Sequence, residues 1–214
     1  MEQIIFSLIT IAILVFSAIL HEVSHGYVAE RFGDPTARLA GRLTLNPKNH
    51  IDPLMSILLP LMLILSGSPV IFGAAKPVPI DPFNLKEGRK DIALVAIAGP
   101  ITNIILAVIA SIIVRLIATL SPTSVLFDFL YLFFLTVVQI NLLLAIFNLL
   151  PIPPLDGSKV FSLLLPKDMA YAYLSLSSIG FFIIFILLFF PIGGFSLGNF
   201  ISTLLTFSQK LLGL

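Results

Sequence analysis

Long runs without a charged residue dominate this chain, and a soluble fold cannot bury them. Runs free of Asp, Glu, Lys and Arg cover residues 3–21, 53–75, 92–114, 129–155 and 169–209. A helix that crosses the hydrocarbon core of a bilayer needs about 20 apolar residues. Charged residues make up 11% of the chain, whereas soluble domains carry about 25%. The sequence therefore predicts an all-α polytopic membrane protein whose main partner is the lipid bilayer.

Interruptions within these runs refine the expected topology. Segment 53–75 holds three prolines and two glycines, which favours a broken or re-entrant segment over a spanning helix. The final run is 41 residues long and is interrupted at Pro191, Gly193 and Gly194, so it predicts a C-terminal helical pair over 169–212 joined by a tight turn. We expect about five spanning helices plus the re-entrant segment.

The chain predicts one membrane-embedded domain, residues 1–214, with a core at 1–160. The first run is preceded by Glu2 instead of basic residues, and no small-residue cleavage site follows it. We therefore expect a retained helix of roughly 3–31. A net charge of +1 excludes a basic field for nucleic acid, and the absence of Cys excludes a disulfide framework.

The end of the first run carries the motif H-E-x-x-H at residues 21–25. On a helix, His21 and His25 share a face and can bind one metal ion. Glu22 lies close to that face and can act as the general base that takes a proton from water. The alternative is a chance match, but ionisable groups near membrane depth are costly and indicate function.

A catalytic zinc ion usually takes three protein ligands. Arg31 occupies the position at which a longer zinc-protease motif places its third histidine, so that pattern is excluded. Asp156 is the better candidate because it follows an uncharged run of 27 residues and would lie near membrane depth. Its alternative role is the N-cap of a helix that starts at Gly157 or Ser158.

If His21 and Asp156 bind the same ion, they must lie at the same depth in the membrane, and this requirement restricts the topology. Three apolar segments separate His21 from Asp156, so one of them must not cross the membrane, and 53–75 is the natural choice. With 53–75 re-entrant, 11 Lys and Arg residues lie on one side and 1 on the other; with 53–75 crossing, the division is 5 against 7. Cytoplasmic loops carry the excess of Lys and Arg. We expect the N-terminus outside and the site near the cytoplasmic face, although a hairpin of two helices would give the same count.

Two remote stretches, HEVSHGYVAERFGD (21–34) and NLLPIPPLDG (148–157), together resemble the site-2 protease family, peptidase family M50. GAAKPVPI (73–80) and AGPITN (98–103) resemble its compact branch, which lacks PDZ and CBS domains and is typical of prokaryotic cell membranes. The resemblance implies an intramembrane zinc metalloprotease that cleaves transmembrane proteins or peptides.

The resemblance also implies individual roles. His21, His25 and Asp156 would bind one zinc ion per chain, and Glu22 would be the general base. Asn148 would position the substrate or stabilise the oxyanion. A buried amide in such a helix can instead bond a neighbouring helix, which is the role that we expect for Asn141.

Several further residues have two interpretations. Lys76, Pro77 and Val78 predict either an edge strand that pairs with an unwound substrate or an ordinary membrane-surface loop. Asn103 follows a Gly-Pro pair, and we expect it to cap or bridge broken backbone near the site and to take part in substrate binding. His50 lies in a polar loop, where a histidine is more often without function.

Two other functions remain in competition with proteolysis. Histidines and carboxylates within a membrane also line ion pathways, so a metal or ion transporter is the principal alternative. The sequence shows no inverted repeats, which many transporters contain. The transporter hypothesis also gives no role to Glu22 between the two histidines. The third possibility is a scaffolding membrane protein with a degenerate site.

Overall fold

The computed structural model describes residues 2–50, 52–65, 76–120 and 124–214. Within these residues the chain is helical, and the only β-pairing described is an isolated bridge between Ile192 and Phe195. The all-α prediction is therefore confirmed for the described part. The chain divides into two compact units, Met1–Lys86 and Glu87–Leu214, which are described separately.

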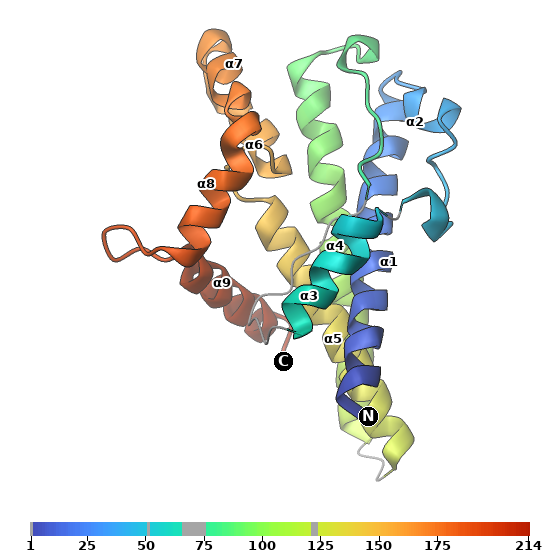
Figure 1. The fold of residues 1–214 in the computed structure, drawn as a ribbon. Coiled ribbons are helices and arrows are strands. Elements are labelled where there is room, and N and C mark those ends of the chain that lie inside the picture. The colour runs from blue at the N-terminus through green and yellow to red at the C-terminus, as the bar shows by residue number, and fades with distance from the viewer. Residues whose placement is uncertain (1, 51, 66–75, 121–123) are drawn as a thin grey trace. The chain divides into compact units, whose positions relative to one another are not determined.

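The first unit is built on one long helix, drawn in dark blue in Figure 1. Its elements are α1 (Glu2–Arg31), α2 (Thr36–Leu39), η1 (Pro47–Asn49), the π-helical turn η2 (Pro53–Leu58), α3 (Leu59–Leu65) and η3 (Pro82–Asn84). Residues Ile4–Arg31 are long and apolar enough to cross a membrane. The predicted helix over 3–31 is confirmed.

A glycine ends α1. Gly33 adopts a φ of +109°, the left-handed region that favours glycine, and its N–H donates to the Glu30 carbonyl. The N–H of Asp34 returns to the Ala29 carbonyl at 3.0 Å. These bonds satisfy carbonyls of the last turn and direct the chain into the loop that carries α2.

The proline-rich segments depart from α-helix. Within run 53–75, residues 53–65 form η2 and α3, whereas 66–75 lie outside the described residues, so the re-entrant segment remains a prediction. Residues 76–81 contain no helix or strand, as expected because residues that precede proline avoid the α region. We call residues 76–81 the Pro-rich segment.

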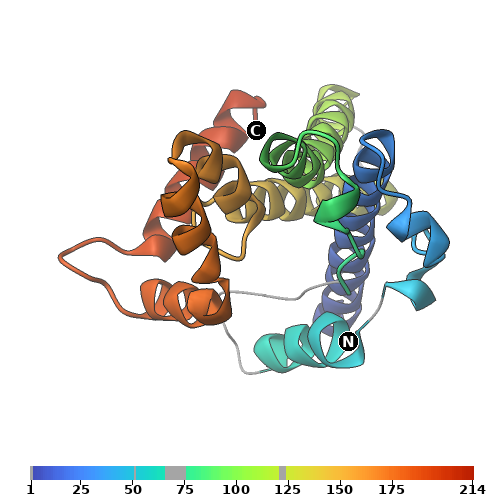
Figure 2. The same cartoon turned by 90° about the horizontal axis from the view of Figure 1, so that it is seen from above.

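The second unit is organised around two antiparallel helices, α4 (Arg89–Leu120) and α5 (Val125–Asn148), which pack side by side (Figures 1 and 2). Both are candidate membrane spans. Small and branched side chains fill the seam between them: Ala107, Ala110, Val114, Val138 and Leu142 are all buried. Small residues let helix backbones approach closely, which is how helices associate in lipid.

A buried polar pair fixes the register of this seam. The Nδ2 of Asn103 donates to the Oδ1 of Asn141 at 2.8 Å, and both residues are 0% exposed. Helix α4 continues through Pro100, so no backbone break lies beside Asn103. The role predicted for Asn141 in packing is confirmed. Asn103 belongs to the same pair, and the expectation that it bridges broken backbone is wrong.

Shorter helices follow α5: α6 (Asp156–Phe161), η4 (Ser162–Leu164), α7 (Lys167–Ser175), α8 (Ser177–Phe189) and α9 (Leu197–Leu211). Helices α7 and α8 form a pair bent by 66°. A tight turn with Gly193 and Gly194 at positive φ joins α8 to α9, as predicted, and it projects away from both helices (Figure 1).

The described residues contain three candidate membrane spans, or up to four if the bent pair α7–α8 counts as one. Helix α9 has 15 residues and is therefore about 22 Å long, shorter than a ~30 Å hydrocarbon core. The described part of the chain is thus that of a multi-helix membrane protein, and the expected five spans are not all present as continuous long helices.

Candidate metal centre

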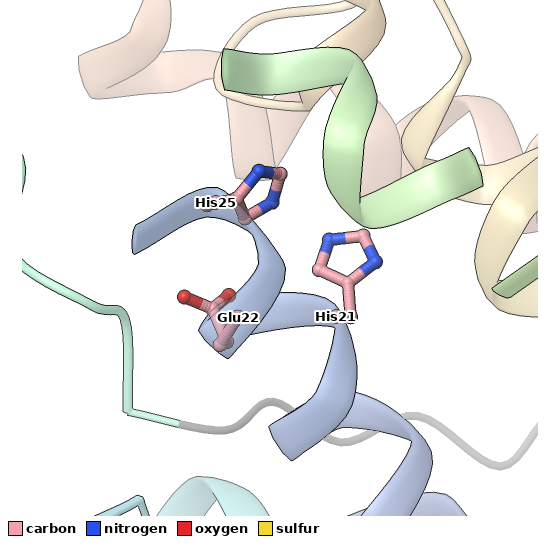
Figure 3. A group of neighbouring side chains, drawn as sticks. All are labelled: His21, Glu22 and His25. Carbon is pink, nitrogen blue, oxygen red and sulfur yellow. The ribbon is translucent and has the colours of Figure 1, made fainter. Parts of the chain in front are cut away.

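Three side chains of one helical turn form the candidate metal centre. Figure 3 shows the imidazoles of His21 and His25 on one face of α1, with the Glu22 carboxylate beside them. One ligand atom from each residue lies within 4.8 Å of the other two. The imidazole centroids are 4.7 Å apart with their planes at 87°. Two imidazole nitrogens and a carboxylate oxygen are a donor set that suits zinc.

This centre lies near one end of a helix of membrane length. Residue 21 is about 26 Å along the axis from residue 4 at a rise of 1.5 Å per residue. Both histidines are only 6% exposed. Ionisable side chains on a helix of membrane length are costly to place near the hydrocarbon core, which makes them candidates for function.

The Glu22 carboxylate is oriented by a backbone group distant in sequence. The N–H of Val78 donates to Glu22 Oε2 at 2.8 Å. This leaves Oε1 as the oxygen that can accept a proton. The sequence analysis placed both residues in the site but assigned them to separate tasks, Glu22 to catalysis and Val78 to substrate binding.

Asp156, the predicted third ligand, lies in the second unit. It is the first residue of α6, whereas the N-cap is Leu155, so the N-cap alternative for Asp156 is wrong. The residue is 7% exposed, and its Oδ1 lies 2.9 Å from Lys159 Nζ. Gly157 brings α6 against the end of α5, because a Cβ at this position would lie 2.2 Å from the Leu149 carbonyl oxygen.

Asn148 closes helix α5 in the same unit. Its Nδ2 donates to the Leu144 carbonyl one turn earlier at 3.0 Å, and the residue is half-buried. An amide nitrogen carries two N–H groups, so this bond leaves a second donor for another acceptor. Asn103, in contrast, is fully buried in the α4–α5 seam, where its Nδ2 donates to Asn141, and its role in substrate binding stays a prediction.

Two residues around the Pro-rich segment were not expected at the site. Arg42 donates from Nη2 to the carbonyls of Lys76 and Pro77, at 2.7 and 3.2 Å. The His50 carbonyl accepts the Lys76 N–H at 2.7 Å, and its ring Nε2 lies 2.8 Å from the Thr44 carbonyl. Sequence reasoning weighed His50 without assigning it a task and missed Arg42, because these bonds are made to backbone atoms.

Burial sets the protonation state of His50. The residue is 0% exposed, and desolvation lowers the pKa of its imidazole below 6.5. The positive charge of Arg42 acts in the same direction, and together they outweigh the Thr44 carbonyl and Glu22, which favour the charged form. His50 is therefore a neutral side chain that supports the loop.

Asp34 anchors the other end of the Pro-rich segment. Its carboxylate accepts hydrogen bonds from the N–H of Asp81 at 2.8 Å, the Asn84 amide at 3.1 Å, and both the N–H and the hydroxyl of Thr36. Burial raises the pKa of this carboxyl, but the hydrogen bonds outweigh burial and the net pKa is lowered. The Pro-rich segment is thus held at three places: at Lys76 by Arg42 and His50, at Val78 by Glu22, and at Asp81 by Asp34.

Comparisons with known proteins show the family of this chain. The model of peptidase family M50 matches residues 9–127 and 117–191. Two relatives are each named "Putative zinc metalloprotease": YwhC of Bacillus subtilis strain 168 and Rip2 of Mycolicibacterium smegmatis. YwhC is 38% identical over 186 residues, which cover 86% of this chain and 81% of YwhC.

Rip2 of M. smegmatis is 34% identical over 184 residues, which cover 86% of this chain and 68% of that relative. Rip2 of Mycobacterium tuberculosis is 35% identical over 147 residues, and this match spans only about half (51%) of that relative's length. No solved structure matches the chain.

Proposed function

Because this chain belongs to peptidase family M50, we propose that it is a zinc protease that hydrolyses peptide bonds within or near the transmembrane segments of other membrane proteins. Family membership and the apolar helices establish a membrane metalloprotease. Cleavage inside the membrane, the substrate class and the orientation are the parts that we add.

One observation carries the proposal: the metal-binding group lies on a helix that is long and apolar enough to cross a membrane. A soluble protease has no need to place two buried imidazoles about 26 Å along such a helix. A substrate that reaches this group must itself be embedded in lipid or lie at the membrane surface. Transmembrane segments of other proteins satisfy that requirement.

We assign three roles to residues of this chain: zinc binding, proton transfer and stabilisation of the oxyanion. His21 and His25 provide imidazole nitrogens to a zinc ion, and we assign the third ligand position to Asp156. Glu22 takes a proton from the attacking water on Oε1 and returns it to the leaving amine. The free N–H of Asn148 is suited to donate to the developing oxyanion. The bound zinc ion would supply Lewis-acid polarisation of the reacting oxygen atoms.

The same arrangement supports a topology. Helices α4 and α5 are long and apolar enough to cross the membrane. If each crosses once and 53–75 does not cross, His21 and Asp156 would lie near the same membrane face. The excess of Lys and Arg then marks that face as cytoplasmic. We propose a multi-pass protein of a prokaryotic cell membrane with its N-terminus outside.

The experiment compares purified wild type with Glu22→Gln on a panel of membrane-helix substrates in proteoliposomes, together with metal analysis. We expect both proteins to hold one zinc ion, and we expect Glu22→Gln to lose about 10²–10⁴-fold in cleavage rate, as for other general bases. Glu87→Gln is the matched control, because the Glu87 side chain is exposed and forms an ion pair with the exposed Lys90.

Two outcomes would contradict the proposal. Full cleavage by Glu22→Gln would remove the general base from the mechanism. Zinc flux across the vesicle without any proteolysis would favour the transporter, for which the relatives offer no support.

A further inference from the structure

The Pro-rich segment has few backbone N–H groups, and its first two, those of Lys76 and Val78, both form hydrogen bonds. Pro77 and Pro79 carry no N–H, so residues 76–79 offer only the N–H groups of Lys76 and Val78. Lys76 donates to the His50 carbonyl, and Val78 donates to Glu22 Oε2. The N–H of Val78 is therefore the one backbone donor within residues 76–79 that remains for the Glu22 carboxylate.

Arg42 and His50 fix the two peptide groups that precede Val78. Arg42 bonds the carbonyls of Lys76 and Pro77, while the His50 carbonyl holds the Lys76 N–H. A charged donor to a carbonyl is among the stronger hydrogen bonds in proteins. Arg42 therefore holds the carbonyl of the peptide group whose N–H belongs to Val78, and His50 holds the chain two residues earlier, at the Lys76 N–H.

Packing against α1 brings the segment close to Glu22. Val78 is 6% exposed, and a Cβ placed on Gly26, one turn beyond Glu22, would lie 3.0 Å from Val78 Cγ1 and 2.6 Å from Leu43 Cδ2. The missing side chain at Gly26 lets the segment approach α1. A larger residue there would displace the peptide that bonds Glu22.

We propose that Arg42 and His50 are positioning residues for the general base, acting through the N–H of Val78 on Glu22 Oε2. The inference rests on the proposed protease function. The bond fixes Oε2 of the carboxylate and leaves Oε1 available to take the proton. Small misplacements of a catalytic group can cost about 10²-fold in rate.

This inference differs from an edge strand that docks the substrate. Strand pairing needs free N–H groups, and those of Lys76 and Val78 are already engaged. A docking strand governs substrate affinity, so its loss raises KM. A positioning contact governs the chemical step, so its loss lowers kcat and leaves KM unchanged.

The central test is a pair of substitutions at Val78. Val78→Pro removes the N–H, whereas Val78→Ala keeps it and removes most of the side chain. We expect Val78→Pro to lower kcat about 10- to 100-fold, with KM within about twofold and one zinc ion retained. We expect Val78→Ala to lower kcat less than Val78→Pro does, because it keeps the N–H and loses only side-chain packing against α1.

A second set of variants covers the case in which Val78→Pro fails to fold. Arg42→Gln should lower kcat about tenfold at unchanged KM, and Arg42→Lys should recover part of it because lysine still donates to a carbonyl. The matched control is Arg38→Gln: Arg38 lies in the preceding helix α2, its side chain is 58% exposed and pairs with Glu30, and its loss should not affect kcat.

Hydrogen exchange supplies a readout independent of activity. Glu22→Ala removes the acceptor and should speed exchange in the peptide that spans 76–81 about tenfold, whereas Glu22→Gln keeps an acceptor oxygen and should not. A rise in KM at constant kcat, equal losses in Val78→Ala and Val78→Pro, or unchanged kcat in Arg42→Gln would overturn the inference. If wild type and Glu22→Gln cleave equally, the proposed function fails instead, whatever the exchange data show.

Discussion

Lys159 Nζ lies 2.9 Å from Asp156 Oδ1, so the carboxylate assigned as the third zinc ligand forms an ion pair within its own helix. The two residues are three positions apart on α6, and Lys159 is 39% exposed at its side chain. An exposed lysine can swing away into solvent when a metal ion takes the carboxylate. The pair therefore competes with metal binding without blocking it.

The competition predicts opposite effects of two substitutions on zinc affinity. Asp156→Ala should weaken zinc binding, and unchanged metal content would remove Asp156 from the ligand set. Lys159→Met should strengthen it, because partly exposed ion pairs contribute about 0.2–1 kcal/mol, equivalent to about 1.4- to 5-fold in Kd. Competition against a zinc chelator measures both. Lys167→Met, on α7, serves as the charge-matched control.

The close contact at Gly157 predicts a strong effect of one methyl group. In Gly157→Ala the added Cβ would meet the Leu149 carbonyl oxygen at 2.2 Å, and backbone cannot rotate away as a side chain can. We expect a loss of about 1–3 kcal/mol in unfolding free energy, as for other overpacked sites. Gly198→Ala on α9 meets nothing closer than 3.8 Å and should be neutral or slightly stabilising in the same denaturation assay.

The hydrogen bonds to Asp34 predict a stability loss that depends on pH. Asp34→Ala leaves the Asp81 N–H and the Asn84 amide without their acceptor and should cost about 2–3 kcal/mol at neutral pH. The carboxyl has a lowered pKa in the folded state, so its contribution is present above the ordinary value of 3.8 and is lost as pH falls through the folded value. Thermal unfolding of both proteins from pH 7 to pH 3 should show the difference shrinking; a constant difference would contradict this.

His50 predicts a second pH dependence, of different origin. Its folded-state pKa is lowered, so below its ordinary value of 6.5 the unfolded chain binds a proton that the folded chain refuses. Stability is therefore full above that value and falls as pH decreases below it. His50→Gln can still donate to the Thr44 carbonyl but does not titrate, so its unfolding midpoint should change less between pH 7 and pH 5. Parallel curves for the two proteins would count against the buried neutral imidazole.

The bond between Asn103 and Asn141 predicts coupling across the α4–α5 seam. Each single change to Ala leaves a buried amide partly unsatisfied, while the double change removes both partners. A double-mutant cycle on unfolding in detergent should give a coupling energy of about 0.6–2 kcal/mol. Cleavage activity should change only as far as stability does, because the two amides bond each other across the α4–α5 seam. Additive effects would show that the pair does not act as a unit.

The sequence determined the class of the protein and the chemistry of its centre. Uncharged runs of membrane length dictate helices, since lipid offers no hydrogen-bond partner to an exposed backbone, and α1, α4 and α5 follow those runs. The spacing of His21 and His25 places both rings on one face by helix geometry alone. Local periodicity suffices for such features because every contact involved is made within one turn.

Tertiary structure decided which backbone group reaches Glu22, which residues hold it there, and which amides serve packing. The bond from Val78 spans 56 positions and those from Arg42 span 34 and 35, so no local pattern encodes them. Backbone atoms are nearly the same at every residue. A hydrogen bond from a side chain to the backbone therefore does not require a particular residue type at the partner position, and the sequence does not reveal it. Asn103 is likewise a polar residue in an apolar run, which in the sequence is equally consistent with a site residue. Only the packing of α5 against α4 shows that its partner is Asn141.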